Sequence, residues 1–342
     1  MARPTIKDLA LEAGVSVSTV NRVVHSPETV RQSTREIVLK AAENIGFYGV
    51  GSIKDSVSQG LETHRLAILL QQGHRMFYRD LGNALKRAAK NFSGANVELE
   101  LEYLDDLSPD NVSRRIVAVG ENTESLGVVA AEHPLVSDAI TSVLANGTPV
   151  SALIGPLSAR GNVGYIGHDN WKKGRVAGWA FHKICRKPGK IGILLGNHRY
   201  RNQEINESGF RSYLREHNTD FTLLEPLSTF ESAAVAREMT EKLLREHPDM
   251  VGLFVSGGGI TGALAALREH KLSDDFVCVA YELFEATRSG LIDGTITMTL
   301  SYPLEIFARE TIETMVKAKK AGPDAGAQRV NIALDIHMSE NV

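Results

Sequence analysis

The chain has 342 residues, of which 43% are hydrophobic and 23% are charged, and its formal net charge is -3. This composition is typical of a globular protein of about two domains, and no apolar run reaches the roughly 18 residues of a membrane span. Because Cys185 and Cys278 are the only cysteines, a disulfide framework and a cysteine-rich metal site are excluded. We therefore expect a cytoplasmic protein without a metal.

The first 46 residues contain three short helical patterns and no strand pattern. Thr5 marks the start of the first helix, and Gly14 can take the left-handed turn that ends it. Ser16 is placed to cap a second helix, and Ser33 opens a capping-box pattern for a third. Two helices separated by a short glycine turn predict a helix-turn-helix head over residues 1–46.

The second predicted helix carries residue types that suit the major groove of DNA. Arg22 can form a bidentate pair with guanine, and Val17 can pack on a thymine methyl group. The predicted DNA-binding residues are Thr5, Ser16, Val17, Ser18, Thr19, Asn21, Arg22, His25 and Thr34. From the helical periodicity alone, a three-helix bundle without a nucleic-acid ligand remains an alternative.

Residues 47–64 are rich in glycine and polar residues, which predicts a linker between the head and a core over 65–342. Within the core, apolar runs of strand length alternate with helical patterns. The runs span 66–70, 97–104, 126–131, 149–154, 190–196, 251–256 and 276–281, and the helices lie near 77–92, 109–120, 134–146, 170–186, 204–217, 230–247, 260–270 and 303–320. Such alternation is typical of an α/β fold, in which doubly wound parallel sheets carry helices on both faces.

The number of these units is too large for one compact sheet, so we expect two similar lobes with a cleft between them. The first lobe is expected to span about 65–163 and 292–322, and the second about 164–291 and 323–342. A last strand is predicted over 330–339.

A glycine-rich segment in the second half allows an alternative function. Gly257, Gly259 and Gly262 fit the G-x-G-x-x-G pattern that brings backbone amides to a dinucleotide pyrophosphate. The alternative is therefore an NAD-dependent sugar or polyol dehydrogenase. However, the segment lies deep in the chain, whereas the fingerprint normally opens its nucleotide-binding unit. Close approach of a sugar or of another helix is the other interpretation of these glycines.

The head resembles the lac repressor (LacI-type) regulators, whose pattern is T-I-x-D-V-A-x-x-A-G-V-S-x-x-T-V-S-R-V-L-N. Here the chain reads TIKDLALEAGVSVSTVNRVVH from Thr5 to His25. The resemblance implies a core like the periplasmic binding proteins, a homodimer on operator DNA, and no cofactor. It implies a DNA-binding transcriptional repressor under allosteric control by a small sugar or polyol between the lobes. A ligand sensor with a vestigial head is a third hypothesis.

The linker departs from this family. Gly49 and Val50 stand where the family has Pro and Asn, and Ser56 stands where it has the leucine that wedges into the minor groove. Val57 or Leu61 could serve as the wedge only if the hinge helix is shifted.

The resemblance also implies effector-binding positions, two of which are changed. Asn206 stands at the family's ligand-binding arginine, and Glu282 stands at its aspartate. The expected effector-binding residues are Phe77, Tyr78, Asp169, Asn170, Arg201, Asn202, Asn206, Phe230 and Glu282. Because carboxylates accept hydrogen bonds from hydroxyls and repel phosphates, we expect a neutral sugar or polyol rather than a sugar phosphate.

Overall fold

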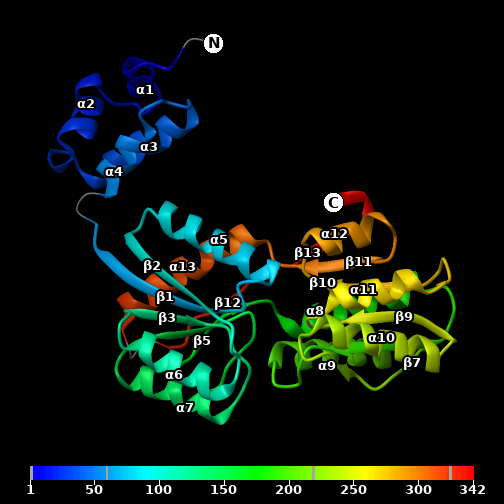
Figure 1. The fold of residues 1–342 in the computed structure, drawn as a ribbon. Coiled ribbons are helices and arrows are strands. Elements are labelled where there is room, and N and C mark those ends of the chain that lie inside the picture. Colours follow the sequence, from blue (N-terminus) through cyan, green and yellow to red (C-terminus); the bar gives the residue numbers. More distant parts are fainter. Residues whose placement is uncertain (1–2, 59–60, 218–219, 323–325) are drawn as a thin grey trace. The chain divides into compact units, whose positions relative to one another are not determined.

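The computed structural model describes residues 3–58, 61–217, 220–322 and 326–342 (Figure 1). The chain divides into two compact units, one of residues 1–65 with 89–98 and one of residues 66–88 with 99–342. The first unit contains the helical head, and the second contains most of the α/β core. None of the helices in the described part of the chain is long and apolar enough to cross a membrane.

The head is built from α1 (Ile6–Glu12), α2 (Val17–His25), a short 3-10 turn (Pro27–Thr29), α3 (Gln32–Asn44) and α4 (Val50–Ser58). The predicted caps of the first two helices are confirmed. Thr5 and Asp8 form a reciprocal capping box, and Ser16 Oγ accepts the amide of Thr19 at 3.0 Å. The predicted cap at Ser33 is wrong, because α3 already begins at Gln32 and has no side-chain cap.

The core contains strands and helices in close alternation. The strands are β1 (Thr63–Gln71), β2 (Asn96–Leu104), β3 (Ser125–Val128), β4 (Val150–Leu153), β5 (Gly164–Gly167), β6 (Lys190–Leu195), β7 (Thr222–Leu223), β8 (Leu227–Ser228), β9 (Met250–Val255), β10 (Val277–Tyr281), β11 (Met298–Ser301), β12 (Arg329–Asn331) and β13 (Asp335–His337). The helices are α5 (Met76–Asn91), α6 (Pro109–Gly120), α7 (Pro134–Ala145), α8 (Asn170–Ile184), α9 (Arg201–Glu216), α10 (Ala233–Glu246), α11 (Ile260–Glu269), α12 (Glu285–Ile292) and α13 (Leu304–Ala321).

The strands form two sheets, which confirms the two-lobed α/β fold. The first sheet has the order β12-β5-β4-β3-β1-β2, and the second has the order β13-β11-β10-β9-β6-β7, with β8 also paired to β6. In the first lobe α6 and α7 cover one face of the sheet, and α5 and α13 lie on the other (Figure 1). In the second lobe α8 and α9 cover one face, and α10 and α11 cover the other. Because both faces are covered, the strand residues form continuous apolar runs.

The lobe membership of the short strands differs from the sequence expectation. β5 pairs with β4 in the first sheet, although residues from 164 on were expected in the second lobe. β11 pairs with β10 in the second sheet, although 292–322 was expected in the first lobe. The single strand expected over 330–339 is two strands, β12 in the first sheet and β13 in the second. The reason is that the chain crosses between lobes after β5, β11 and β12, and a strand's apolar pattern does not reveal which sheet it joins.

The three crossing segments meet at His168. Its backbone amide donates to Tyr302 Oη at 3.0 Å, and the two rings stack with centroids 3.5 Å apart. Its Nδ1 donates to the carbonyl oxygen of Ile332 at 3.0 Å, which places the ring proton on that nitrogen. One residue from each of the other two crossings thus contacts the His168 imidazole, so His168 holds together the three segments that connect the lobes.

His168 makes the stability of the core depend on pH. Burial first, and then the positive charge of Lys173, lower the pKa of His168 to about 2 from its usual 6.5. Below pH 6.5 the unfolded chain binds a proton that the folded chain does not, so stability falls as the pH falls. We expect His168→Asn to remove about 2 kcal/mol of the loss between about pH 6.5 and pH 5, measured by urea unfolding.

The control for this prediction is His198→Asn, because the His198 side chain is 57% exposed. This variant is expected to keep the pH slope of the parent chain. An unchanged slope in His168→Asn would show that the acid sensitivity arises at other residues.

Candidate functional site

The exposed face of α2 carries most of the predicted DNA-binding residues. Val17, Ser18, Asn21, Arg22 and His25 are exposed, whereas the remaining valines of the helix face the head core. Of the others, Thr5 and Ser16 are exposed at helix starts, and Thr19 and Thr34 are half-buried. The head therefore presents one polar helix face with an arginine at its middle, as base recognition in a major groove requires.

The linker contains a helix, α4, whose apolar side chains belong to the head core. Ile53 is 0% and Val57 is 3% exposed. Ser56 Oγ donates to the carbonyl oxygen of Val23, and Gln32 Nε2 donates to that of Val57 at 3.2 Å. The hypothesis that Val57 serves as a minor-groove wedge is therefore not supported by this arrangement, because its side chain is already packed inside the head.

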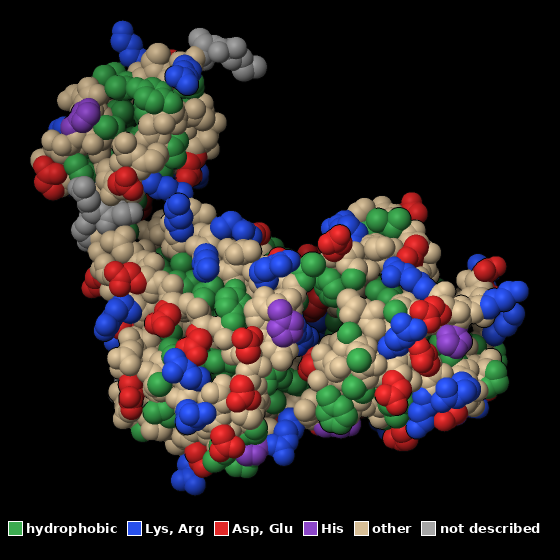
Figure 2. Space-filling model, in the orientation of Figure 1, with side chains coloured by type: hydrophobic (Ala, Val, Ile, Leu, Met, Phe, Trp, Pro, Cys, Tyr) green, Lys and Arg blue, Asp and Glu red, His purple; other side chains and the backbone are tan. Residues whose placement is uncertain are grey.

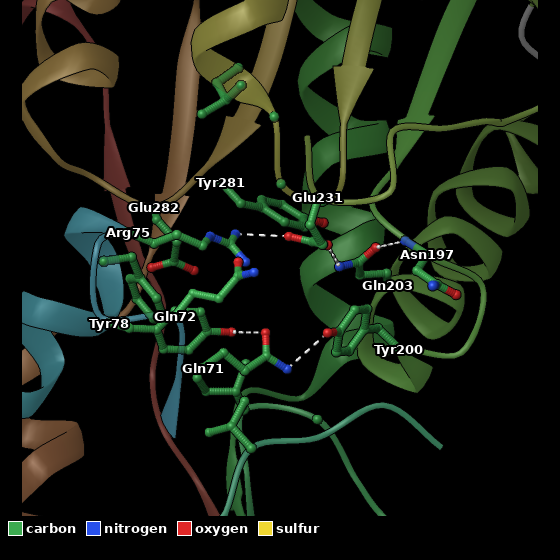
Figure 3. A pocket seen from close by; sticks show the side chains of 18 of the residues that line it. Gln71, Gln72, Arg75, Tyr78, Asn197, Tyr200, Gln203, Glu231, Tyr281 and Glu282 are labelled. Atoms are coloured by element: carbon green, nitrogen blue, oxygen red, sulfur yellow. Dashed lines mark hydrogen bonds and ion pairs between the residues drawn. The ribbon is translucent and has the colours of Figure 1, made fainter. Parts of the chain in front are cut away.

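A cavity of about 1370 Å³ lies between the two lobes of the core (Figure 3). Its walls come from segments that follow β1, β3, β6, β8, β9 and β10. The carboxyl ends of parallel strands are the usual place for ligands in α/β sheets. The position of the cavity thus follows from the strand order of both lobes.

Backbone strain is concentrated in the walls of this cavity. Four non-glycine residues of the described ranges have a positive φ, namely Ile154, Phe230, Glu231 and Glu282 with angles of 68°, 51°, 61° and 66°. All four line the cavity. Residues in such conformations persist only where the surrounding structure holds them, and they cluster at functional sites.

An ion pair crosses the cavity from one lobe to the other. Arg75, directly before α5, donates from Nη2 to Glu231 Oε2 at 2.8 Å (Figure 3). Glu231 Oε1 accepts from Gln203 Nε2 at 2.8 Å, and Gln203 Oε1 accepts the backbone amides of Gly196 and Asn197 at 2.7 and 3.2 Å. The carboxylate is therefore fixed on both oxygens.

A second ion pair lies deeper in the same cavity. Lys173 Nζ donates to Glu282 Oε1 at 3.2 Å and lies 4.0 Å from the centre of the Tyr281 ring. Glu282 Oε2 accepts the backbone amide of Tyr302 at 3.2 Å. Burial lowers the pKa of Lys173, and the nearby Glu282 carboxylate opposes this shift. The ammonium is thus retained by one carboxylate and aromatic ring faces.

A third polar chain also joins the lobes. Tyr78 Oη donates to Gln71 Oε1 at 3.1 Å, and Gln71 Nε2 donates to Tyr200 Oη at 2.9 Å (Figure 3). Burial raises the pKa of Tyr200 to about 12, so its hydroxyl is neutral at physiological pH. These three side chains therefore provide neutral amide and hydroxyl groups that a ligand can bind beside the two ion pairs.

The structure brings six of the nine expected effector-binding residues to the cavity, and they are Phe77, Tyr78, Asn170, Asn202, Phe230 and Glu282. The other three lie outside its lining. Asp169 caps α8 through the amide of Lys172, and Arg201 bonds Glu132 and Ser158. Asn206 is buried where α9 closely approaches α8 at Gly174. Asp169 and Asn206 were expected from a family pattern and Arg201 from its place just upstream of Asn206, and neither kind of signal records which way a side chain points in the fold.

Four residues of the site were not predicted from the sequence: Arg75, Lys173, Gln203 and Glu231. Each of them lies close in the chain to a residue that was expected in the site. Arg75 directly precedes the aromatic pair that was expected in the site, and Glu231 directly follows Phe230. Lys173 lies three residues after Asn170 on α8, which is the spacing of one helix face. Gln203 directly follows Asn202, which was also expected in the site, but its role depends on a recess that forms only in the folded lobe.

The glycines of the dinucleotide-like pattern serve close packing. A Cβ added to Gly257 would lie 2.0 Å from the amide nitrogen of Gly196. Gly259 has a φ of 94°, and a Cβ added to Gly262 would lie 1.7 Å from the carbonyl oxygen of Ala233. The glycines thus let a neighbouring loop and helix pack closely, which is the second of the two interpretations given above, close approach of another helix.

We expect Gly262→Ala to destabilise the core by about 1–3 kcal/mol, because the added methyl group forces α10 and α11 apart. Urea unfolding measures the effect. Gly326→Ala is the control, since an added Cβ meets no atom within 4 Å there. A stability equal to that of the parent chain would refute the packing role of Gly262.

Two family models match separate parts of the chain. Residues 5–49 match the family of bacterial regulatory proteins of the lacI type, and residues 67–323 match the periplasmic binding protein domain. The sucrose operon repressor of Escherichia coli is 31% identical over 115 residues, which are 33% of this chain and 34% of that protein. The chain thus covers about a third of the length of this relative.

Other similarities extend further along the chain. The ribose operon repressor of Bacillus subtilis (strain 168) is 24% identical over 333 residues, 93% of each chain. The solved glucose-galactose binding protein GanP from Geobacillus stearothermophilus superposes with a TM-score of 0.74 at 16% identity, over 82% of this chain and 99% of GanP. This likeness shows the fold of the core.

Fold and site together define a class, a helix-turn-helix head joined to a two-lobed binding-protein core. The chain belongs to the periplasmic binding protein domain family, whose model matches residues 67–323, and its residues 5–49 match the lacI family of bacterial regulatory proteins. The dehydrogenase alternative receives no support from the relatives, which are named as repressors and transcriptional regulators.

Proposed function

We propose that this chain is a transcriptional repressor that acts without catalysis in the cytoplasm and is controlled by a small sugar or polyol. The observation that carries the proposal is the pairing of an exposed recognition-helix face with a polar cavity between two lobes. Sugar operon repressors among the relatives and sugar-binding proteins among the solved structures support the ligand class.

The charges of the cavity favour a neutral ligand. Among the described lining residues, four are basic (Arg75, Lys173, Arg199 and Arg268) and four are acidic (Glu132, Glu231, Glu282 and Glu285). Arg75 is neutralised by Glu231, and Lys173 is neutralised by Glu282, so these pairs leave no excess positive charge to bind a phosphate. The visible surface of the core likewise mixes both signs of charge (Figure 2). Such paired charges raise the affinity for a polyhydroxy ligand, because each charged group forms a stronger hydrogen bond with a hydroxyl than a neutral group does.

The proposed mechanism couples lobe closure to DNA binding. A ligand that contacts both lobes favours one rotation of the lobes about the His168 crossings. In a homodimer on a near-palindromic operator, this rotation would alter the interface and the presentation of the two heads. In this scheme three of the expected effector-binding residues act without touching the ligand. Asp169 and Asn206 support helices α8 and α9, and Arg201 contacts the other lobe through Glu132 and Ser158.

Two measurements test the proposal. Selection of bound sequences from random duplex DNA should return a near-palindrome with two half-sites, as a symmetric dimer requires. A thermal-shift screen of neutral sugars and polyols should identify a stabilising ligand, since saturation at 100 times its dissociation constant adds about 2.7 kcal/mol. The identified ligand should then change operator affinity. Failure to select any sequence, or an operator affinity indifferent to every sugar, would contradict the proposal.

A further inference from the structure

The carboxylate of Glu231 lies in a recess made by two glycines, Gly196 and Gly258. A Cβ added to Gly196 would lie 1.6 Å from Glu231 Oε1, and one added to Gly258 would lie 1.9 Å from Oε2. At Gly257 it would lie 2.0 Å from the amide nitrogen of Gly196, so the two backbone segments touch beside the recess. Any side chain at Gly196 or Gly258 would occupy the place of the carboxylate. The glycines therefore act to admit Glu231.

The orientation of this carboxylate is set from several directions. Gln203 binds one oxygen and is itself held by two backbone amides, so its amide group cannot turn. Arg75 binds the other oxygen at 2.8 Å. Glu231 has a φ of 61°, a conformation that glutamate rarely adopts without such contacts. A side chain held in this way at a cavity wall is organised before a ligand arrives.

Arg75 and Glu231 together leave one donor and some acceptor capacity for a ligand. Arg75 Nη1 is buried and has no hydrogen-bond partner in the described part of the structure. A carboxylate offers about four lone-pair sites, and the side-chain bonds described above use two of those on Glu231. A hydroxyl accepts and donates hydrogen bonds from a single atom without carrying charge, so neighbouring hydroxyls match this donor and this acceptor.

We propose that Arg75 and Glu231 are the specificity-determining pair for the effector, which deepens the proposed function and rests on it. One ligand hydroxyl accepts from Arg75 Nη1, and a neighbouring hydroxyl donates to Glu231 while the ion pair stays intact. An anionic group at this point is repelled by Glu231, and a cationic group is repelled by Arg75. Because the pair joins the two lobes, hydroxyls bound there also favour the closed arrangement.

The test uses the full chain and a panel of neutral sugars that includes glucose, galactose, xylose, ribose and sucrose. Each is compared with its monodeoxy, amino, uronic acid and phosphorylated derivatives where these exist. We expect a neutral sugar to bind, and expect Glu231→Gln to lower its affinity about tenfold or more, as loss of a charged hydrogen bond does. We also expect Glu231→Gln to lose the discrimination of the parent chain against one monodeoxy analogue.

Arg201→Ala is the matched control. Arg201 also joins the lobes, through Glu132 and Ser158, but it does not line the cavity. Its loss should change the affinity for a sugar and for its deoxy analogues by the same factor. If Glu231→Gln does not fold, Gly258→Ala replaces it, because the added methyl group displaces the same carboxylate.

The possible results separate the two proposals. In one of them a neutral sugar binds while Glu231→Gln or Gly258→Ala leaves the ratio of its affinity to that of its monodeoxy analogue unchanged. This result would overturn the assignment of the pair and leave the proposed function standing. Tighter binding of the amino, acid or phosphorylated derivative by the parent chain would also overturn it. If no sugar of the panel binds, the proposed function fails, and the assignment of the pair fails with it.

Discussion

Replacing Lys173 with methionine is expected to destabilise the core by about 3 kcal/mol, the lower end for removing one partner of a buried ion pair. The Lys173 side chain is 4% exposed, and that of its partner Glu282 is 18% exposed. Without the ammonium, the carboxylate of Glu282 keeps only the backbone amide of Tyr302 among its described hydrogen bonds. Urea unfolding of the free protein measures the change.

Two further variants decide whether the pair is the cause. Lys172→Met removes a neighbouring lysine whose side chain is 78% exposed, and it should change stability by less than about 0.5 kcal/mol. The double variant Lys173→Met with Glu282→Gln should be less destabilised than the sum of the two single variants, because no buried charge is left unpaired. Strict additivity would show that the two side chains do not interact.

Arg22→Ala is expected to cost about 1–3 kcal/mol of specific operator binding and to relax the preference at one base pair. Arg22 lies on the exposed face of α2, where a guanidinium can form two hydrogen bonds with a guanine. Titration of the selected operator and of single-base variants, at one salt concentration, measures both effects.

Thr19→Ala provides the contrast for Arg22. Thr19 lies at the start of α2, beside the cap formed by Ser16, where side chains approach phosphates. Its loss should weaken all DNA sequences alike. If Arg22→Ala also weakened every sequence equally, Arg22 would be a phosphate contact and the base-reading residue would lie elsewhere on the helix.

Much of the head follows from short-range sequence signals. The capping box of Thr5 with Asp8 and the cap at Ser16 each join residues three apart, and such contacts form within one helical turn. The cap expected at Ser33 failed because packing against the rest of the head lets α3 begin earlier. The sequence did not establish a helix in the linker, because the stability of α4 comes from burying Ile53 and Val57 in the head core.

The sequence by itself determined the resemblance of the head to the lacI-type regulators, the alternation of strands and helices, and the aromatic pair Phe77 and Tyr78 at the start of the first core helix. These features depend on local periodicity and on residues close together in the chain. Only the tertiary structure decided that Arg75 meets Glu231 and that Lys173 meets Glu282. Each pair joins segments that are far apart in the chain, and both glutamates adopt a positive φ that local propensity disfavours, so tertiary packing had to impose the contacts.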